Sequence, residues 1–169
     1  ADIDDAAYQM ETLYRSRGYA FARVAYRITP QEKKVAVVFE VFEGPLVTVD
    51  AVDITGNAHL DSTQLNTFFR WQPSSDGGES TPIFTQSALD QALSQVADAY
   101  ILQGFRDVVI DTPQLAFNND RTRVTINVPI REGIQYVVRE VRVREAPDGD
   151  AVIEGADYAA FHVPDCPRC

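Results

Sequence analysis

The sequence predicts an α+β fold, made of tandem units of the order β-α-α-β-β, each a three-stranded mixed sheet covered on one face by two helices. First, a stretch with helical apolar spacing is followed by two alternating apolar stretches, which indicates a helix and a β-hairpin. Second, this order occurs twice, with Tyr14 corresponding to Tyr100 and Gly44 to Gly133. Third, each hairpin closes on a Glu-Gly pair. The repeat is longer than a solenoid unit, so we expect small domains in tandem.

The first copy supplies one helix and one hairpin. Asp2 to Arg17 is predicted to be a helix with an acidic first turn, and Gly18 ends it because glycine takes the left-handed conformation readily. Tyr19 to Thr29 and Lys33 to Glu43 are the predicted hairpin strands. Nothing in this copy corresponds to the strand and helix that open a complete unit.

The second copy begins with a strand from Leu46 to Ile54, which alternates and ends at the turn residues Gly56-Asn57. Asp61 or Ser62 then caps a short helix. The stretch from Gln72 to Pro82 is rich in Pro, Ser and Gly, and we expect a flexible loop between two helices.

The second helix of this copy is capped by Thr85 and ended by Gly104. A hairpin follows, with a strand at Val108–Ile110, a turn at Asn118–Asp120 and a strand at Val124–Ile130. The helix faces must bury against the sheet. The predicted core residues are Leu65, Phe68, Phe69, Leu89, Leu93, Val96, Tyr100 and Ile101.

A third copy is predicted to begin at Tyr136, because Tyr136–Val143 follows its Glu-Gly pair as Val47–Ile54 follows the first one. We therefore expect three parts. Residues 1–45 are the C-terminal part of one domain, residues 46–135 a complete domain, and residues 136–169 the first strand of a following domain with an irregular tail. The chain would then be cut from a longer protein.

Charge and hydropathy exclude several partners. The formal net charge is −10 and the sequence pI is about 4.5, which argues against nucleic acid because phosphate binding needs clustered Lys and Arg. An anionic bilayer surface would also repel the chain. The longest apolar run, Val35–Phe39, is far shorter than the roughly 20 residues of a membrane-spanning helix. The acidic N-terminus does not match a signal peptide.

Five short motifs resemble those of a known family. They are Val52-Asp53-Ile54-Thr55-Gly56-Asn57, Ala99-Tyr100 with Gly104-Phe105, Arg131-Glu132-Gly133, Leu13-Tyr14 with Gly18-Tyr19, and Phe42-Glu43-Gly44. A β-α-α-β-β unit carrying them is similar to the polypeptide-transport-associated domain, or POTRA domain. The resemblance covers about Asp4 to Val143.

The resemblance implies the periplasmic arm of an outer-membrane β-barrel protein of the BamA and TamA kind, on the periplasmic side of the outer membrane. The implied partners are unfolded outer-membrane proteins, accessory assembly lipoproteins and the protein's own C-terminal membrane barrel, which this chain does not contain. The missing barrel, the incomplete first copy and the long loop depart from the family pattern. A structural spacer, a two-partner secretion transporter and a division protein therefore stay open as alternatives.

The resemblance also places the first strand of each hairpin at an open sheet edge, which can bind another chain by strand addition. The candidate partner-binding residues are Arg106, Asp107, Val108, Val109, Ile110, Asp111 and Thr112, and in the first copy Ala22, Val24, Tyr26 and Ile28. The alternative is a purely structural edge, in which Arg106, Asp107 and Asp111 block pairing.

No enzyme or cofactor site is predicted, because the sequence has no nucleophile elbow, no His-Glu-x-x-His and no phosphate-binding loop at Gly77-Gly78. We interpret His59 as a lone surface-loop residue, and the glycines of the two Glu-Gly pairs as positive-φ positions whose glutamates accept backbone N–H bonds. His162, Cys166 and Cys169 leave three readings open: a zinc site, a Cys166–Cys169 disulfide, or unpaired residues.

Overall fold

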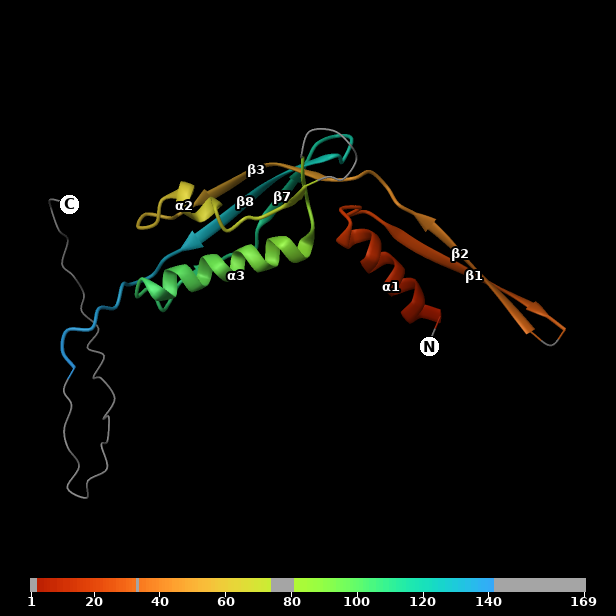
Figure 1. The fold of residues 1–169 in the computed structure, drawn as a ribbon, viewed down its shortest axis with the longest axis horizontal. Coiled ribbons are helices and arrows are strands. Elements are labelled where there is room, and N and C mark those ends of the chain that lie inside the picture. Colours follow the sequence, from red (N-terminus) through yellow and green to blue (C-terminus); the bar gives the residue numbers. More distant parts are fainter. Residues whose placement is uncertain (1–2, 33, 74–80, 142–169) are drawn as a thin grey trace, which may run out of the picture.

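The computed structural model describes residues 3–32, 34–73 and 81–141 (Figure 1). Its elements are α1 (Ile3–Ser16), β1 (Arg23–Gln31), β2 (Lys34–Phe42), β3 (Thr48–Thr55), α2 (Ser62–Asn66), β4 (Gln72–Pro73), β5 (Pro82–Ile83), α3 (Gln86–Leu102), β6 (Val109–Ile110), β7 (Gln114–Phe117) and β8 (Arg123–Arg131). We call α1, β1 and β2 the N-terminal half-unit, and β3 to β8 the central unit. Within the described ranges, no helix is long and apolar enough to span a bilayer.

The sheet of the central unit is built around β8. β3 pairs with β8 in parallel, with Val52 beside Ile126, whereas β6 and β7 pair with it antiparallel on the other side. Alternate residues of β8 are buried and face α3, which runs along one face of the sheet (Figure 1). The predicted fold class, α+β with a mixed sheet, is therefore confirmed. The predicted number of three strands is not, because β6 and β7 share the third position and the short strands β5 and β4 continue the sheet beyond β3.

The core lies between α3 and this sheet, and it contains most of the residues that helical spacing assigned to it. The buried members of that set are Leu65, Phe69, Leu89, Val96 and Tyr100, while Phe68 and Leu93 are partly buried. Ile101 was predicted to be core, but its side chain is 49% exposed. It follows the buried Tyr100 directly, so the turn of the helix rotates it away from the sheet.

Both helices of the central unit begin close to their predicted caps. The Thr85 hydroxyl accepts a hydrogen bond from the Ala88 N–H at 3.3 Å, which satisfies one of the unpaired donors at the start of α3. α2 begins after Asp61, whose side chain makes no capping bond. α2 has only five residues, and Leu65 anchors it because this side chain is fully buried in the core.

The N-terminal half-unit is a two-stranded sheet with one helix. β1 and β2 pair antiparallel from Arg23 beside Phe42 to Gln31 beside Lys34, and α1 packs along β1 (Figure 1). β2 occupies the place that β8 has in the central unit. Val35 is nevertheless 63% exposed, whereas its counterpart Val124 is fully buried. In the described residues, this sheet has no strand corresponding to β3.

Three predicted stretches differ from the structure. The strand predicted at Val108–Ile110 is the two-residue β6, and a separate strand, β7, was not predicted; Pro113 lies between them and has no N–H for a ladder. The predicted loop from Gln72 to Pro82 begins and ends in a short antiparallel pair, β4 and β5. Residues 136–141 form no strand, because no described segment lies beside them to complete a ladder.

The core assignment can be tested with the same substitution at two positions of α3. Leu89 is 2% exposed and Leu102 is 85% exposed. We expect Leu89→Ala to lower the free energy of unfolding by about 2–5 kcal/mol, because it leaves a cavity in the core. Leu102→Ala should change it by less than about 0.5 kcal/mol. Urea unfolding followed through Trp71, the single tryptophan, measures both; equal losses would contradict the assignment.

Candidate protein-binding edge and the junctions between units

β6 and β7 form the outer edge of the central sheet. The strand order is β4-β5-β3-β8-β6, with β7 also paired to β8, and among the described residues no strand lies beyond β6 or β7. Two hydrogen bonds show which backbone groups of this edge point toward β8. The Asp111 N–H donates to the Pro129 carbonyl and the Asn118 N–H donates to the Arg123 carbonyl, each at 3.0 Å. By the alternation of antiparallel ladders, the outward-turned backbone groups include those of Ile110, Leu115 and Phe117.

The predicted edge residues lie in several different structural environments. Arg106 and Asp107 lie in the turn after α3, and Val108 is partly buried just before β6, which contains Val109 and Ile110. Asp111 accepts a 2.6 Å hydrogen bond from Arg131 of β8, and Thr112 is exposed before Pro113. Sequence reasoning missed that β7 supplies the longer part of this edge. The sequence pattern that could have predicted β7 is the alternation of the apolar residues Leu115 and Phe117, which pair with Ile126 and Val124 of β8.

The corresponding edge of the N-terminal half-unit is β1. Ala22 lies just before β1 and is fully buried. The Val24 N–H donates to a carboxylate oxygen of Glu11 on α1 at 2.9 Å, so this outward backbone donor is already used. The Tyr26 hydroxyl donates to Asp4 at 2.6 Å. By alternation from Val24, the N–H of Ile28 also points outward. α1 therefore closes the beginning of this edge.

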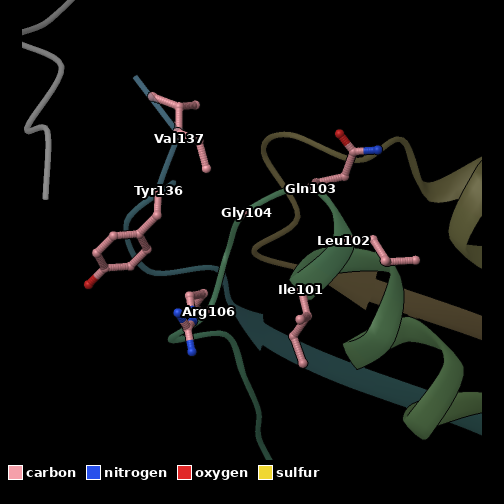
Figure 2. A pocket seen from close by; sticks show the side chains of 8 residues that line it. Ile101, Leu102, Gln103, Gly104, Arg106, Tyr136 and Val137 are labelled. Carbon is pink, nitrogen blue, oxygen red and sulfur yellow. The ribbon is translucent and has the colours of Figure 1, made fainter. Parts of the chain in front are cut away.

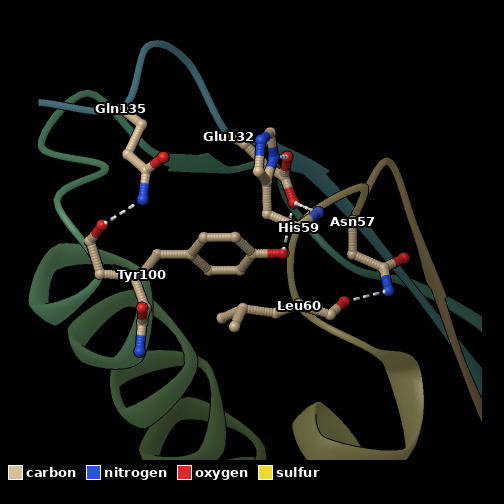
Figure 3. Close-up of polar contacts among 7 residues, drawn as sticks. Asn57, His59, Leu60, Tyr100, Glu132 and Gln135 are labelled. Atoms are coloured by element: carbon tan, nitrogen blue, oxygen red, sulfur yellow. Dashed lines mark hydrogen bonds and ion pairs between the residues drawn. The ribbon is translucent and has the colours of Figure 1, made fainter. Parts of the chain in front are cut away.

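A buried glutamate network connects three parts of the central unit (Figure 3). Glu132 follows β8, and one of its oxygens accepts hydrogen bonds from the Tyr100 hydroxyl of α3 and from the His59 N–H, each 2.9 Å. Its second oxygen lies 2.5 Å from Nδ1 of His59, whose ring packs against Phe105. The prediction that this glutamate accepts a backbone N–H is confirmed. His59 is a surface-loop residue, as interpreted, but it is not alone, because it contacts Glu132, which is distant in sequence.

These contacts set the charge of the network. Burial alone would raise the pKa of Glu132. The hydrogen bonds from the backbone and ring of His59 and from the Tyr100 hydroxyl, together with the charge of His59, outweigh that effect and lower the pKa below its ordinary value. Burial raises the pKa of Tyr100, and the adjacent carboxylate raises it further. Glu132 is therefore held as an anion and Tyr100 as a neutral donor.

The ends of α1 and α3 have the same geometry. Gly18 and Gly104 have φ values of +96° and +93°. The Gly18 carbonyl accepts the Val47 N–H at 3.0 Å, and the Gly104 carbonyl accepts the Tyr136 N–H at 2.8 Å. An edge-to-face aromatic pair flanks each glycine, with ring centroids 6.0 Å apart for Tyr14–Tyr19 and 5.7 Å for Tyr100–Phe105. Each helix therefore binds the segment that follows its own hairpin.

The two junctions differ in their side chains. At the first, the Phe21 ring meets Phe117 of the central unit edge-to-face at 5.0 Å, and the Arg121 guanidinium lies 5.0 Å from the centre of the Phe21 ring. At the second, Asp107 occupies the position of Phe21 and accepts a 2.6 Å hydrogen bond from the Tyr136 hydroxyl. Beside it lies an open pocket of about 490 Å³ between the end of α3 and residues 136–138 (Figure 2).

Among residues 3–32, 34–73 and 81–141, no group of three or more His, Cys, Asp or Glu side chains is placed to hold a metal ion. His162, Cys166 and Cys169 lie outside the described residues, and so do Gly77-Gly78. The features of the described residues that could bind another protein are therefore the sheet edges and the junctions between units.

Comparison with known proteins agrees with this arrangement. The family model named POTRA, described as "Surface antigen variable number repeat", matches residues 1–44 and 47–133. A solved structure of POTRA domains 3–5 of BamA from Haemophilus influenzae is 19% identical, with a TM-score of 0.53, and the match covers 84% of this chain and 54% of that one. BamA from Haemophilus ducreyi lacking POTRA domains 1–3 is 20% identical, with a TM-score of 0.49 and coverage of 76% and 22%.

The glutamate network predicts a pH-dependent stability. Because the pKa of Glu132 is lower in the folded than in the unfolded chain, its contribution is complete above the ordinary glutamate pKa and is lost as the pH falls through the folded value. At pH 7, Glu132→Gln should lower the free energy of unfolding by roughly 1.5–3 kcal/mol. The difference from wild type should shrink in acid. Glu43→Gln, at the exposed counterpart, is the control; a pH-independent difference for Glu132→Gln would contradict the assignment.

The first junction can be tested by a double-mutant cycle. A Cβ at Gly18 would lie 2.2 Å from Cγ2 of Ile83 in β5, in a backbone conformation with φ +96°. Gly18→Ala should therefore lower stability by more than the roughly 1–2 kcal/mol of left-handed strain. On an Ile83→Ala background the same change should cost less, because the clashing carbon is gone. Urea unfolding followed by circular dichroism measures all four proteins, and strict additivity would show that the two residues do not touch.

Proposed function

The chain belongs to the POTRA family, and we propose that it is part of a periplasmic protein-binding scaffold of an outer-membrane protein assembly or insertion factor. It spans about half the length of the BamA fragment that it matches over POTRA domains 3–5. In this proposal residues 1–45, 46–135 and 136–169 belong to three successive domains. The partners are unfolded outer-membrane proteins, accessory assembly lipoproteins and a membrane barrel in the same protein.

The observation that carries the proposal is the edge formed by β6 and β7. Backbone groups of Ile110, Leu115 and Phe117 turn outward there, and the described chain places no strand on them. An extended client segment can add a strand to such an edge, because main-chain hydrogen bonds do not depend on the client's sequence. A scaffold that receives many different clients needs this kind of recognition.

The same edge sets a low affinity. Each net hydrogen bond contributes roughly 0.5–1.5 kcal/mol, and ordering the client segment costs free energy. Pro113 separates β6 from β7. A client strand can therefore form main-chain hydrogen bonds with two short strands, but not with one continuous strand. Weak binding suits a scaffold that must release each client to the membrane. The ion pair between Asp111 and Arg131 favours in-register pairing of β6 with β8, and it thereby maintains the backbone geometry of the edge.

A structural spacer is the second candidate function. It is favoured by the junctions, where backbone bonds and the Phe21–Phe117 contact hold one unit against the next. It is also favoured by β1, whose edge is partly closed by Glu11. In that case the chain positions a barrel and binds accessory subunits without touching clients. The two functions differ in one measurable property, which is whether the β6/β7 edge binds extended peptides.

Binding at the edge is tested by titrating the isotope-labelled protein with peptides taken from outer-membrane barrel strands. We expect amide shifts centred on Ile110, Leu115 and Phe117, with smaller shifts in β3. Leu115→Pro should lower the affinity about fivefold or more, because it removes one outward N–H worth about 1 kcal/mol. Leu115→Ala is the matched control, since it loses the same side chain and keeps the N–H.

Two results would contradict strand addition. The first is a set of amide shifts confined to residues away from β6 and β7. The second is an equal loss of affinity in Leu115→Pro and Leu115→Ala while both variants stay folded, as judged by Trp71 fluorescence. Either result would favour the spacer.

A further inference from the structure

The turn that joins β7 to β8, residues 118–122, lies against the N-terminal half-unit (Figure 1). Phe117 is the last residue of β7, and its ring meets the Phe21 ring edge-to-face with centroids 5.0 Å apart. Arg121 belongs to the turn itself, and its guanidinium lies 5.0 Å from the centre of the same Phe21 ring. One side chain of the half-unit therefore contacts both the end of β7 and the turn that follows it.

Phe117 belongs both to the β6/β7 edge and to the first junction. Its backbone groups turn outward, where the proposed client strand pairs. Its ring packs against the core of the central unit, and Phe21 of the half-unit packs against the same core. The position of this end of β7 therefore depends on a residue of the preceding unit.

Arg121 has an unusual backbone conformation. Its φ of +55° lies in the left-handed region, which residues other than glycine rarely adopt. Such a conformation persists only where the surrounding contacts hold it. Here the Arg121 N–H donates to the Asn118 carbonyl at 3.0 Å, and the guanidinium is placed over the Phe21 ring. Glycine would adopt this φ without strain but could not make the cation–π contact, so the strained residue is also the one that contacts the preceding unit.

Hydrogen bonds connect the same turn to the backbone of the first junction. The side-chain oxygen of Asn118 accepts the Thr122 N–H at 2.8 Å, which closes the turn. The Thr122 carbonyl accepts the Thr48 N–H at 2.9 Å. Thr48 directly follows Val47, whose N–H binds the Gly18 carbonyl at 3.0 Å. The turn after β7 is therefore joined to the junction through side chains at Phe21 and through backbone bonds at Thr48.

We propose that the N-terminal half-unit holds the β6/β7 edge in the geometry that binds a client strand, through the contacts of Phe21 with Phe117 and Arg121. The inference rests on the proposed client binding at this edge, and it adds control of that binding by the preceding unit. Coupling between two sites is reciprocal, so a client strand on β7 also stabilises the junction. The affinity of the edge therefore depends on how the preceding unit packs against the central unit.

Ordering of the turn is tested without a client, by amide hydrogen exchange of the 169-residue protein. We expect Phe21→Ala to make the Asn118 and Thr122 amides exchange roughly three- to tenfold faster, because it removes an aromatic pair and a cation–π contact. Arg121→Asn, whose side chain tolerates the left-handed conformation, should give a smaller increase. Phe42→Ala is the matched control, because it removes the same atoms from the same half-unit at a side chain that is 64% exposed, and it should leave both rates unchanged.

Coupling to the edge is tested by titrating the same proteins with a peptide that has the sequence of an outer-membrane barrel strand. Phe21→Ala should weaken peptide binding roughly three- to tenfold, because the end of β7 is no longer held in place. Phe42→Ala should leave the affinity unchanged. In the unsubstituted protein, the peptide should slow the exchange of the Val47 amide, which lies in the junction and not in the edge.

Two results overturn the proposal. The first is unchanged exchange of the Asn118 and Thr122 amides in both Phe21→Ala and Arg121→Asn, with each variant folded as judged by circular dichroism. The second is faster exchange in these variants together with an unchanged affinity for the peptide. If the unsubstituted protein binds no peptide, client binding at the edge is contradicted, and the exchange rates still decide whether Phe21 orders the turn. The control by the preceding unit and the client-binding function can therefore fail separately.

Discussion

The arrangement of this chain depends on a glycine that ends a helix in the left-handed conformation and offers its carbonyl to the chain segment after the hairpin. At Gly18 that carbonyl binds Val47, and at Gly104 it binds Tyr136. A residue with a Cβ would be strained at this φ and would also meet the neighbouring unit. The same backbone position thus ends a helix, leads into a strand and fixes where the next unit starts.

The Glu132 network shows why a whole unit is needed for this geometry. Its carboxylate sits after β8, its hydroxyl donor comes from α3, and His59 comes from the turn between β3 and α2. In the N-terminal half-unit, Tyr14 and Glu43 occupy the corresponding positions, but Glu43 is exposed and the described residues contain no counterpart of His59. The buried anion is stable only where all three elements supply donors, because an unpaired buried charge is costly.

Local patterns in the sequence predicted local structure, and contacts distant in sequence escaped them. Thr85 and Gly104 marked the ends of α3 because caps depend on adjacent residues. The contact between His59 and Glu132 left no local pattern, although a Tyr and a Glu recur at matching places in both copies. The interruption between β6 and β7 at Pro113 was not predicted, because the alternation of apolar residues does not show that proline lacks the N–H needed for strand pairing. Ile101 was assigned to the core because helical spacing alone cannot distinguish residues at the centre of the buried helix face from residues at the edge of that face.

The interrupted edge and the repeated junction together suggest how a weak receptor can work. In the proposed function, one short ladder would bind a client segment weakly, and each further unit with an open edge would add another binding site. A client bound at one edge would then be held near the next at a high effective concentration, so that overall binding would be stronger than at any single edge while each contact still exchanges. This gain requires that successive edges keep their spacing, which loose linkers would not provide. The packing of side chains around Gly18 is therefore as important to the proposed function as the open backbone of β7.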